Sequence, residues 1–181
     1  KLQRLGKAFM IPIAVLPVAG LMLGIGAAFT NPVMLQTYGL TAILGPGTVT
    51  NVVLSVMAAI GEAVFNNLPL IFAVGVAAGL SLQEKGAAAL SAAIGFLVFH
   101  TVISRILGFL GHTPETSTVA YYLAQGLSNV KAAEMANVYG TELGIFTVKI
   151  GVLGGIIVGV LTSILTNRYY NKQLPASLSF F

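Results

Sequence analysis

The chain contains no cysteine, no tryptophan and no aspartate. Without thiols, it cannot form disulfide bonds, thiolate metal sites or cysteine-based phosphoryl carriers. All of its acidic residues are glutamates, so a Ser-His-Asp catalytic triad is excluded. The glycine pair around Ile25 is not preceded by a strand pattern or accompanied by a lysine with a following serine or threonine, which excludes a phosphate-binding loop. We therefore predict no self-contained catalytic site and no bound cofactor.

Charge is also scarce: 8% of the residues are charged and 56% are hydrophobic, with a mean hydropathy of +0.92. Soluble domains contain about 25% charged residues, so a soluble fold would have too few polar groups to cover its surface. The net charge of +4 would suggest a nucleic-acid partner only if the basic residues clustered, but they lie at the ends of apolar runs. These features predict an integral protein of the lipid bilayer, without a nucleic-acid partner.

Four apolar stretches are long enough to cross a bilayer core of about 30 Å, given a helical rise of about 1.5 Å per residue. The second stretch contains Pro69, which removes a backbone donor and predicts a tilted or broken helix. The pattern predicts an all-α fold, a polytopic integral membrane helix bundle with about four transmembrane helices. The predicted spans are Met10–Phe29, Val52–Leu80, Gly86–Leu110 and Leu143–Leu165.

Two loops connect these spans on the predicted outer side. The loop Asn31–Asn51 is uncharged, and the loop Gly111–Glu142 is longer and mildly acidic. Within the second loop, Ser117–Gln125 and Val130–Tyr139 have helix-like spacing, which predicts amphipathic helices at the membrane interface. We find no soluble domain or linker.

The basic residues indicate the orientation, because cytoplasmic loops of membrane proteins are enriched in lysine and arginine. Lys131 falls in the outer loops, while Arg105 and Lys149 lie near span ends from which their side chains can reach the membrane surface. The pattern predicts that both ends of the segment are cytoplasmic. The basic residues on that side are Lys1, Arg4, Lys7, Lys85, Arg168 and Lys172.

Glycines spaced four residues apart occur in three of the predicted spans. Such spacing leaves one helix face as bare backbone, so that a neighbouring helix can approach closely inside lipid. We therefore predict helix packing at these positions, either within the chain or against a second copy. The candidates are Gly151, Gly155 and Gly159, then Gly75 with Gly79, and Gly20 with Gly24.

Few polar residues fall within the predicted spans, and each allows two interpretations. Glu62 and Asn66 are one helical turn apart, so the two side chains could line a polar path. Alternatively, Glu62 sits at a helix kink or interface, where local backbone donors satisfy its carboxylate. His100 serves either in a proton relay or as a packing residue in an apolar helix. His112 and Glu115 lie close together in the outer loop, but two ligands are an incomplete set, so no metal site is predicted.

Several motifs, in order along nearly the whole chain, resemble the membrane (IIC) domain of the bacterial sugar phosphotransferase system. The similarity is to its glucose/maltose/N-acetylglucosamine branch, and the length of the second outer loop favours maltose-type members. The segments that carry the resemblance are Leu2–Gly20, Asn67–Val76, Glu84–Leu90, Gly151–Ile157, Asn167–Pro175 and Leu178–Phe181.

The resemblance implies a homodimeric permease of the inner (plasma) membrane that imports a sugar while the sugar is phosphorylated. The implied sugar is maltose, another glucoside, or glucose. It implies a cytoplasmic phosphocarrier partner, the IIB domain, and places the essential histidine and glutamate of the family in later helices. Neither later motif occurs in this chain, so residues 1–181 correspond to the N-terminal scaffold and dimerisation part. His100 lies in the wrong segment to replace the family's histidine.

The chain begins at Lys1 and stops at Phe181 without a polar tail, so we expect a fragment of a longer polypeptide whose later half carries the sugar site and the phosphoenolpyruvate-dependent activity. The alternative hypothesis is a small ion- or proton-coupled membrane transporter that uses Glu62.

Overall fold

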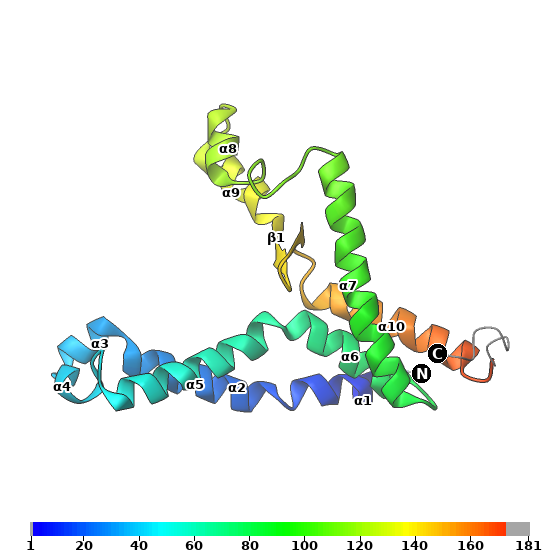
Figure 1. The fold of residues 1–181 in the computed structure, drawn as a ribbon, viewed down its shortest axis with the longest axis horizontal. Helices are drawn as coiled ribbons and strands as arrows, with labels where there is room; N and C mark the ends of the chain where they lie inside the picture. The colour runs from blue at the N-terminus through cyan, green and yellow to red at the C-terminus, as the bar shows by residue number, and fades with distance from the viewer. Residues whose placement is uncertain (1, 173–181) are drawn as a thin grey trace.

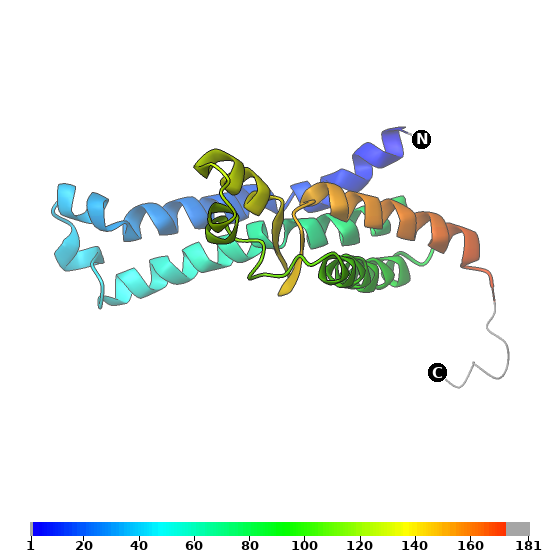
Figure 2. The same ribbon diagram turned by 90° about the horizontal axis from the view of Figure 1, so that it is seen from above.

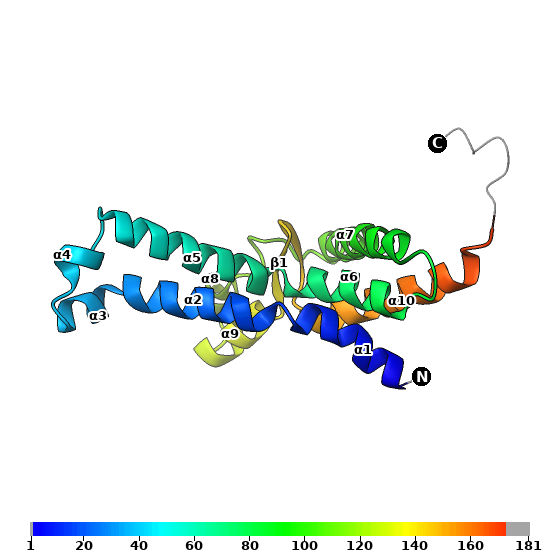
Figure 3. The same cartoon turned by 90° about the horizontal axis from the view of Figure 1, so that it is seen from below.

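A computed structural model describes residues 2–172, and in that part of the chain the fold is mostly helical (Figure 1). Its longest feature is an antiparallel hairpin of four helices, in which α2 packs beside α5 and α1 packs beside α6 (Figures 2 and 3). Two short helices, α3 and α4, close the far end of this hairpin. The elements are α1 (Leu2–Ile13), α2 (Leu16–Thr30), α3 (Pro32–Thr37), α4 (Thr41–Leu44), α5 (Val49–Asn66) and α6 (Leu68–Leu80).

Prolines account for the breaks in both arms of the hairpin. Pro17 lies in the first turn of α2, where a missing N–H costs nothing. Pro69 occupies the same position in α6, after a break at Asn67. The break predicted within Val52–Leu80 is confirmed, and it divides the stretch into two helices. At about 1.5 Å per residue, α5 is about 27 Å long and falls within the length range of transmembrane helices, whereas α6 is about 20 Å long and falls below it.

The second half of the chain leaves the hairpin and returns to it. Helix α7 runs across the hairpin axis, and α10 comes back to pack on α6 (Figure 1). Between them lie two short helices and a two-stranded antiparallel sheet that packs against α7. These elements are α7 (Lys85–Phe109), α8 (Val119–Ala124), α9 (Asn129–Asn137), β1 (Tyr139–Glu142), β2 (Ile145–Val148) and α10 (Val152–Tyr169).

The β1–β2 hairpin corrects the predicted span Leu143–Leu165. Leu143 and Gly144 form its turn with positive φ angles of 51° and 81°. Gly151 follows with φ 59° and ψ −144°, a conformation that residues other than glycine avoid. An apolar run does not by itself distinguish a strand from a helix. The membrane-length helix therefore begins at Val152 and extends to Tyr169.

The two helices predicted in the outer loop are present as α8 and α9, close to their predicted bounds. The hydroxyl of Thr118 accepts a hydrogen bond from the Tyr121 amide at 3.2 Å and caps the start of α8. In the first loop, α3 was not predicted. Asn31 caps it by accepting from the Val33 amide at 2.9 Å.

Four helical stretches of the described residues are long and apolar enough to cross a membrane, which confirms the predicted fold class. They are Gly6–Thr30, Val49–Asn66, Lys85–Phe109 and Val152–Tyr169. The buried core is small and is built largely from alanine, around Ala73, Phe96 and Val158. Large apolar side chains are mostly on the surface, as expected for a protein that is surrounded by lipid or packs against another membrane protein.

Candidate functional site

Helix α10 meets α6 through glycine, and we call this contact the α6–α10 seam (Gly155 and Gly159 against Pro69 and Ala73). A β-carbon on Gly155 would overlap the carbonyl oxygen of Pro69, and one on Gly159 would lie 2.6 Å from the carbonyl oxygen of Ala73. The backbones themselves are therefore in contact at two successive turns. Such proximity maximises dispersion contacts and allows weak Cα–H···O bonds.

The opposite side of α6 packs equally closely against α1. A β-carbon on Gly75 would lie 2.8 Å from the ring of Pro12, and one on Gly79 would lie 2.6 Å from the Cα of Ala8. Both predicted glycines of α6 thus lie at a helix contact. Helix α6 is held between two helices by backbone proximity on either side.

A third close contact, between α2 and α5, involves glycines that sequence analysis missed. A β-carbon on Gly26 would lie 2.5 Å from the Ala58 amide, and one on Gly61 would lie 2.5 Å from the Ala19 carbonyl oxygen. Each glycine meets an alanine on the other helix, so neither helix alone shows the pattern. The only sign of this contact in the sequence was that both helices contain small residues, glycine and alanine.

Three of the predicted packing glycines make no such approach. Gly151 precedes α10 rather than lying on its face, and a β-carbon there would meet nothing within 4 Å. The same is true of Gly24, while Gly20 would meet only the ring of Phe65 at 3.9 Å. The prediction for Gly151 is corrected, because this glycine serves a turn conformation before α10. Within the described residues Gly20 and Gly24 make no close helix contact, and their packing against a second copy stays a prediction.

The break between α5 and α6 opens into a polar cavity of about 530 Å³, which we call the helix-break cavity. Asn66 and Asn67 line it from the break, and Thr141 and Glu142 line it from the β1–β2 turn. The start of α10 completes the wall at Val152. Segments far apart in sequence therefore meet around one recess, as is typical where a membrane helix is interrupted.

Within this cavity, Glu142 is partly buried and Asn66 is exposed. Burial raises the pKa of the Glu142 carboxyl above its ordinary value. The side-chain amide of Asn67 donates to the carbonyl oxygen of Ala63 at 2.7 Å, which fixes its orientation at the end of α5. Asn66 reaches the cavity as part of a polar cluster, whereas its predicted companion Glu62 lies exposed on α5 and does not line it.

His100 lies in a buried contact between α7 and β2. Its side chain is 1% exposed, and its Nδ1 is 3.0 Å from the Oγ1 of Thr147, which is 0% exposed. Phe96 and Phe99 face the imidazole edge-on at ring-centroid distances of 4.4 and 5.1 Å. Among the described residues its Nε2 has no hydrogen-bond partner. This environment is that of a packing histidine that fastens the sheet to α7.

Asn167 joins α10 to the turn between α6 and α7. Its side-chain oxygen accepts a hydrogen bond from the Leu82 amide at 2.8 Å, and its side-chain nitrogen donates to the Leu80 carbonyl at 3.2 Å. These bonds satisfy backbone groups at the end of α6, which have no partner within the helix. In the sequence, Asn167 stands out only as part of the segment Asn167–Pro175, and its contact with this turn was not predicted.

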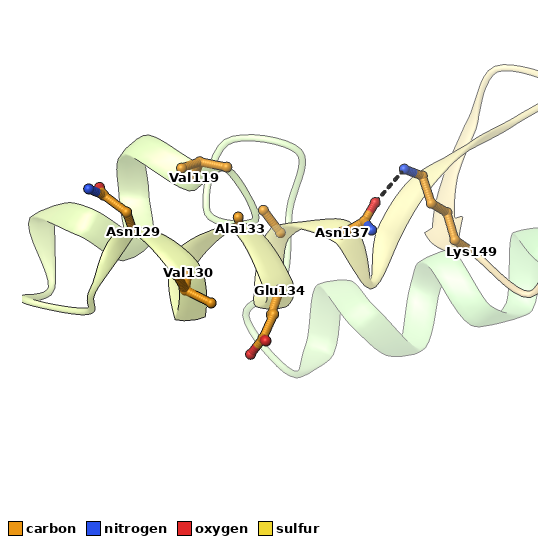
Figure 4. Close-up of a pocket in the computed structure, with 8 residues that line it drawn as sticks. Val119, Asn129, Val130, Ala133, Glu134, Asn137 and Lys149 are labelled. Atoms are coloured by element: carbon orange, nitrogen blue, oxygen red, sulfur yellow. Dashed lines mark hydrogen bonds between the residues drawn. The ribbon is translucent and has the colours of Figure 1, made fainter.

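A second recess lies beside α8 and α9 (Figure 4). The Lys149 ammonium donates to the Asn137 side-chain oxygen at 3.1 Å there. Asn129 and Glu134 point away from this pair, in different directions (Figure 4). Because its polar groups do not converge on one point, the recess lacks the arrangement of a specific binding site.

The outer-loop residues His112 and Glu115 contact different partners. The His112 ring stacks on Tyr139 at a centroid distance of 5.0 Å. The hydroxyl of Thr113 donates to the Glu115 carboxylate at 2.6 Å, and this bond lowers the pKa of that carboxyl. Both side chains thus have local structural partners.

A family model covers the part of the chain that carries these features. The family described as "Phosphotransferase system, EIIC" matches residues 6–181. The matched region includes the α6–α10 seam, the helix-break cavity and the Asn167 contact.

Proposed function

Because the chain belongs to the EIIC family of the phosphotransferase system, and so is a membrane component of a sugar permease that works with a IIB phosphocarrier, we propose that residues 1–181 form the helical scaffold of that permease. The observation that carries this proposal is the packing of α6 between α1 and α10. Backbone contacts on both sides of one helix leave little room for sliding. A moving sugar-binding part requires such a fixed partner.

The scaffold is proposed to dimerise through α5. Val53, Val56 and Ile60 recur at helical spacing on one face of this helix, and all are exposed. Such a face is suited to a second copy of the chain as well as to lipid. Disulfide cross-linking of a Val53→Cys protein in native membranes tests the pairing, with buried Val158→Cys on α10 as the control that is expected not to cross-link.

The proposed substrate is maltose or another glucoside, with glucose as the next candidate. The long segment between α7 and α10, with its two helices and its sheet, supports this choice because its length favours maltose-type members of the family. The proposed location is the inner membrane, with both ends of the segment and the IIB partner on the cytoplasmic side, where most of the basic residues lie.

Phosphoenolpyruvate-dependent phosphorylation by the full-length protein that contains this chain tests the function. Purified protein is supplied with the soluble phosphocarriers and a panel of maltose, glucose and N-acetylglucosamine. We expect phosphorylation of one sugar of the panel well above the others. A protein that phosphorylates none of these sugars, although folded and membrane-inserted, would contradict the proposal.

A further inference from the structure

The scaffold role does not account for the helix-break cavity. Close helix packing in lipid favours small residues and dry contacts, yet this cavity gathers amide, hydroxyl and carboxylate groups from two distant segments. Asn66 and Thr141 are exposed, and Asn67 and Glu142 are only partly buried, so their polar groups are open to water or to a ligand. The polar groups of this cavity are therefore available for binding and are not used for helix packing.

The polar groups of the cavity suit a ligand with many hydroxyl groups. The carboxylate of Glu142 accepts hydrogen bonds, while the amide of Asn66 and the hydroxyl of Thr141 both donate and accept. Because the Asn67 amide nitrogen already donates to Ala63, the Asn67 carbonyl oxygen is left as an acceptor. A sugar hydroxyl, which is both donor and acceptor, can pair with every one of these groups.

The helix break leaves one backbone carbonyl with spare acceptor capacity in the same wall. The carbonyl of Phe65, which lines the cavity, accepts from the Asn67 amide at the end of α5. Because Pro69, four residues later, has no N–H, the second lone pair of this carbonyl stays free. The remaining wall is apolar, at Leu68, Leu143 and Val152. A mixed lining of this kind can face the C–H surface of a sugar ring while polar groups hold its hydroxyls.

Size and charge argue against a bare cation and against a phosphorylated sugar. A volume of about 530 Å³ falls within the range of small-molecule pockets, about 300–1,000 Å³, and is far larger than a directly coordinated cation needs. No lysine or arginine is among the lining residues that the structure describes. A phosphorylated sugar would bring its negative charge towards Glu142 with no cation to offset the repulsion.

We propose that the helix-break cavity is a saccharide subsite of the scaffold, selective for the unphosphorylated sugar over its phosphorylated product. The identity of the sugar rests on the proposed permease function. The site is built from the α5–α6 break, the β1–β2 turn and the start of α10, so it depends on the α6–α10 seam for its shape.

Cysteine protection in the full-length protein tests the subsite, because residues 1–181 contain no native cysteine; any cysteine elsewhere in the protein is first replaced by serine. A Thr141→Cys protein is alkylated with a small maleimide, with and without maltose or glucose. We expect the sugar to slow alkylation several-fold and the sugar phosphate to have little effect. Thr50→Cys, which is exposed near the far end of the hairpin, is the matched control and should show no protection. If Thr141→Cys does not fold, Leu143→Cys is the second reporter on the same turn.

Two added substitutions locate the source of any protection. Glu142→Gln and Asn66→Leu, each combined with the reporter cysteine, should remove it, whereas protection that persists in both arises elsewhere and overturns the subsite. Phosphorylation is measured separately on the unmodified full-length protein. If that protein phosphorylates the sugar but the sugar does not protect Thr141→Cys, the subsite alone is refuted. If the unmodified protein phosphorylates no sugar, the proposed function is refuted.

Discussion

The Nδ1 of His100 and the Oγ1 of Thr147 lie 3.0 Å apart, although 47 residues separate them in sequence. Both side chains are buried, so the hydrogen bond is shielded from water. It connects the middle of α7 to β2, and through β2 it positions the turn that carries Glu142. A structural bond outside the helix-break cavity thus helps to hold the sheet whose turn forms one wall of the cavity.

Thr147→Val removes this hydroxyl while keeping the shape of the side chain. We expect a loss of about 1–3 kcal/mol of stability, because the imidazole Nδ1 would be buried without a partner. Thermal unfolding in detergent measures the effect. Thr101→Val is the control: Thr101 is exposed on α7 and its hydroxyl bonds only to Leu97 of its own helix, at 2.7 Å. Equal melting temperatures for the two variants would contradict the structural role of the bond.

Gly155→Ala tests the α6–α10 seam with the smallest possible change. Its β-carbon would overlap the Pro69 carbonyl oxygen, so the two helices must separate. Overpacking costs about 1–3 kcal/mol in soluble cores, and Gly155→Leu should cost more. Gly24→Ala, in a helix with nothing within 4 Å of the new methyl group, should be neutral or stabilising by up to about 1 kcal/mol. A Gly155 variant with the same melting temperature as the wild type would show that the two helices can separate at little cost in stability.

The sequence predicted the helical fold, the break at Pro69 and the existence of α8 and α9, because each depends on local chemistry: apolar length, a missing N–H, or helix-like spacing. It could not supply the partners. The close contact of Gly26 with Ala58, where an added β-carbon would lie 2.5 Å from the Ala58 amide nitrogen, depends on how α2 and α5 pair, which neither helix encodes alone.

The prediction for Leu143–Leu165 was wrong for a physical reason. Ile145–Val148 is as apolar as a helical segment, and only the positive φ angles at Leu143 and Gly144 turn it into a hairpin. The Leu-Gly pair was a weak signal for that turn. Because the hairpin carries Thr141 and Glu142, the same error concealed the helix-break cavity.

Asn167→Ala should loosen the turn between α6 and α7. The variant leaves the Leu82 amide and the Leu80 carbonyl without their partner, so we expect faster hydrogen exchange at the Leu82 amide. Mass spectrometry of peptides that span residues 80–85 measures this. Asn171→Ala is the control, because Asn171 is exposed. Unchanged exchange in the Asn167 variant would mean that the turn is held by other contacts.

Labelling with a membrane-impermeant thiol reagent tests the predicted orientation. The start of α1 and the turn between α6 and α7 lie at one end of the hairpin, and α3 lies at the other (Figure 1). Cysteines at Gln3 and Gln83 should therefore react only from the cytoplasmic side. Those at Gln36 and Gln125 should react from outside. If a cysteine of the first pair (Gln3, Gln83) and a cysteine of the second pair (Gln36, Gln125) were labelled from the same side of the membrane, the four-span topology would be contradicted.

Glu142→Gln should change the pH dependence of stability. Because burial raises the pKa of Glu142 above its ordinary value, the folded protein retains a proton at a pH where the unfolded chain has lost it. This carboxyl therefore costs no stability below the ordinary pKa of about 4.3, and its cost grows as the pH rises through the folded-state pKa. We expect Glu142→Gln to be more stable than the wild type at neutral pH and to lose that advantage near pH 4.

Glu115→Gln is the matched comparison, because its shift has the opposite sign. The hydrogen bond from Thr113 lowers the pKa of Glu115, so that carboxylate contributes stability above its ordinary pKa and loses the contribution as the pH falls through the folded-state value. Glu115→Gln should thus be slightly less stable than the wild type at neutral pH and equal to it in acid. Urea unfolding of both variants between pH 3 and pH 8 separates the two slopes. The same slope for both variants would mean that the two carboxyls share one environment, and the partial burial of Glu142 against the helix break would then be wrong.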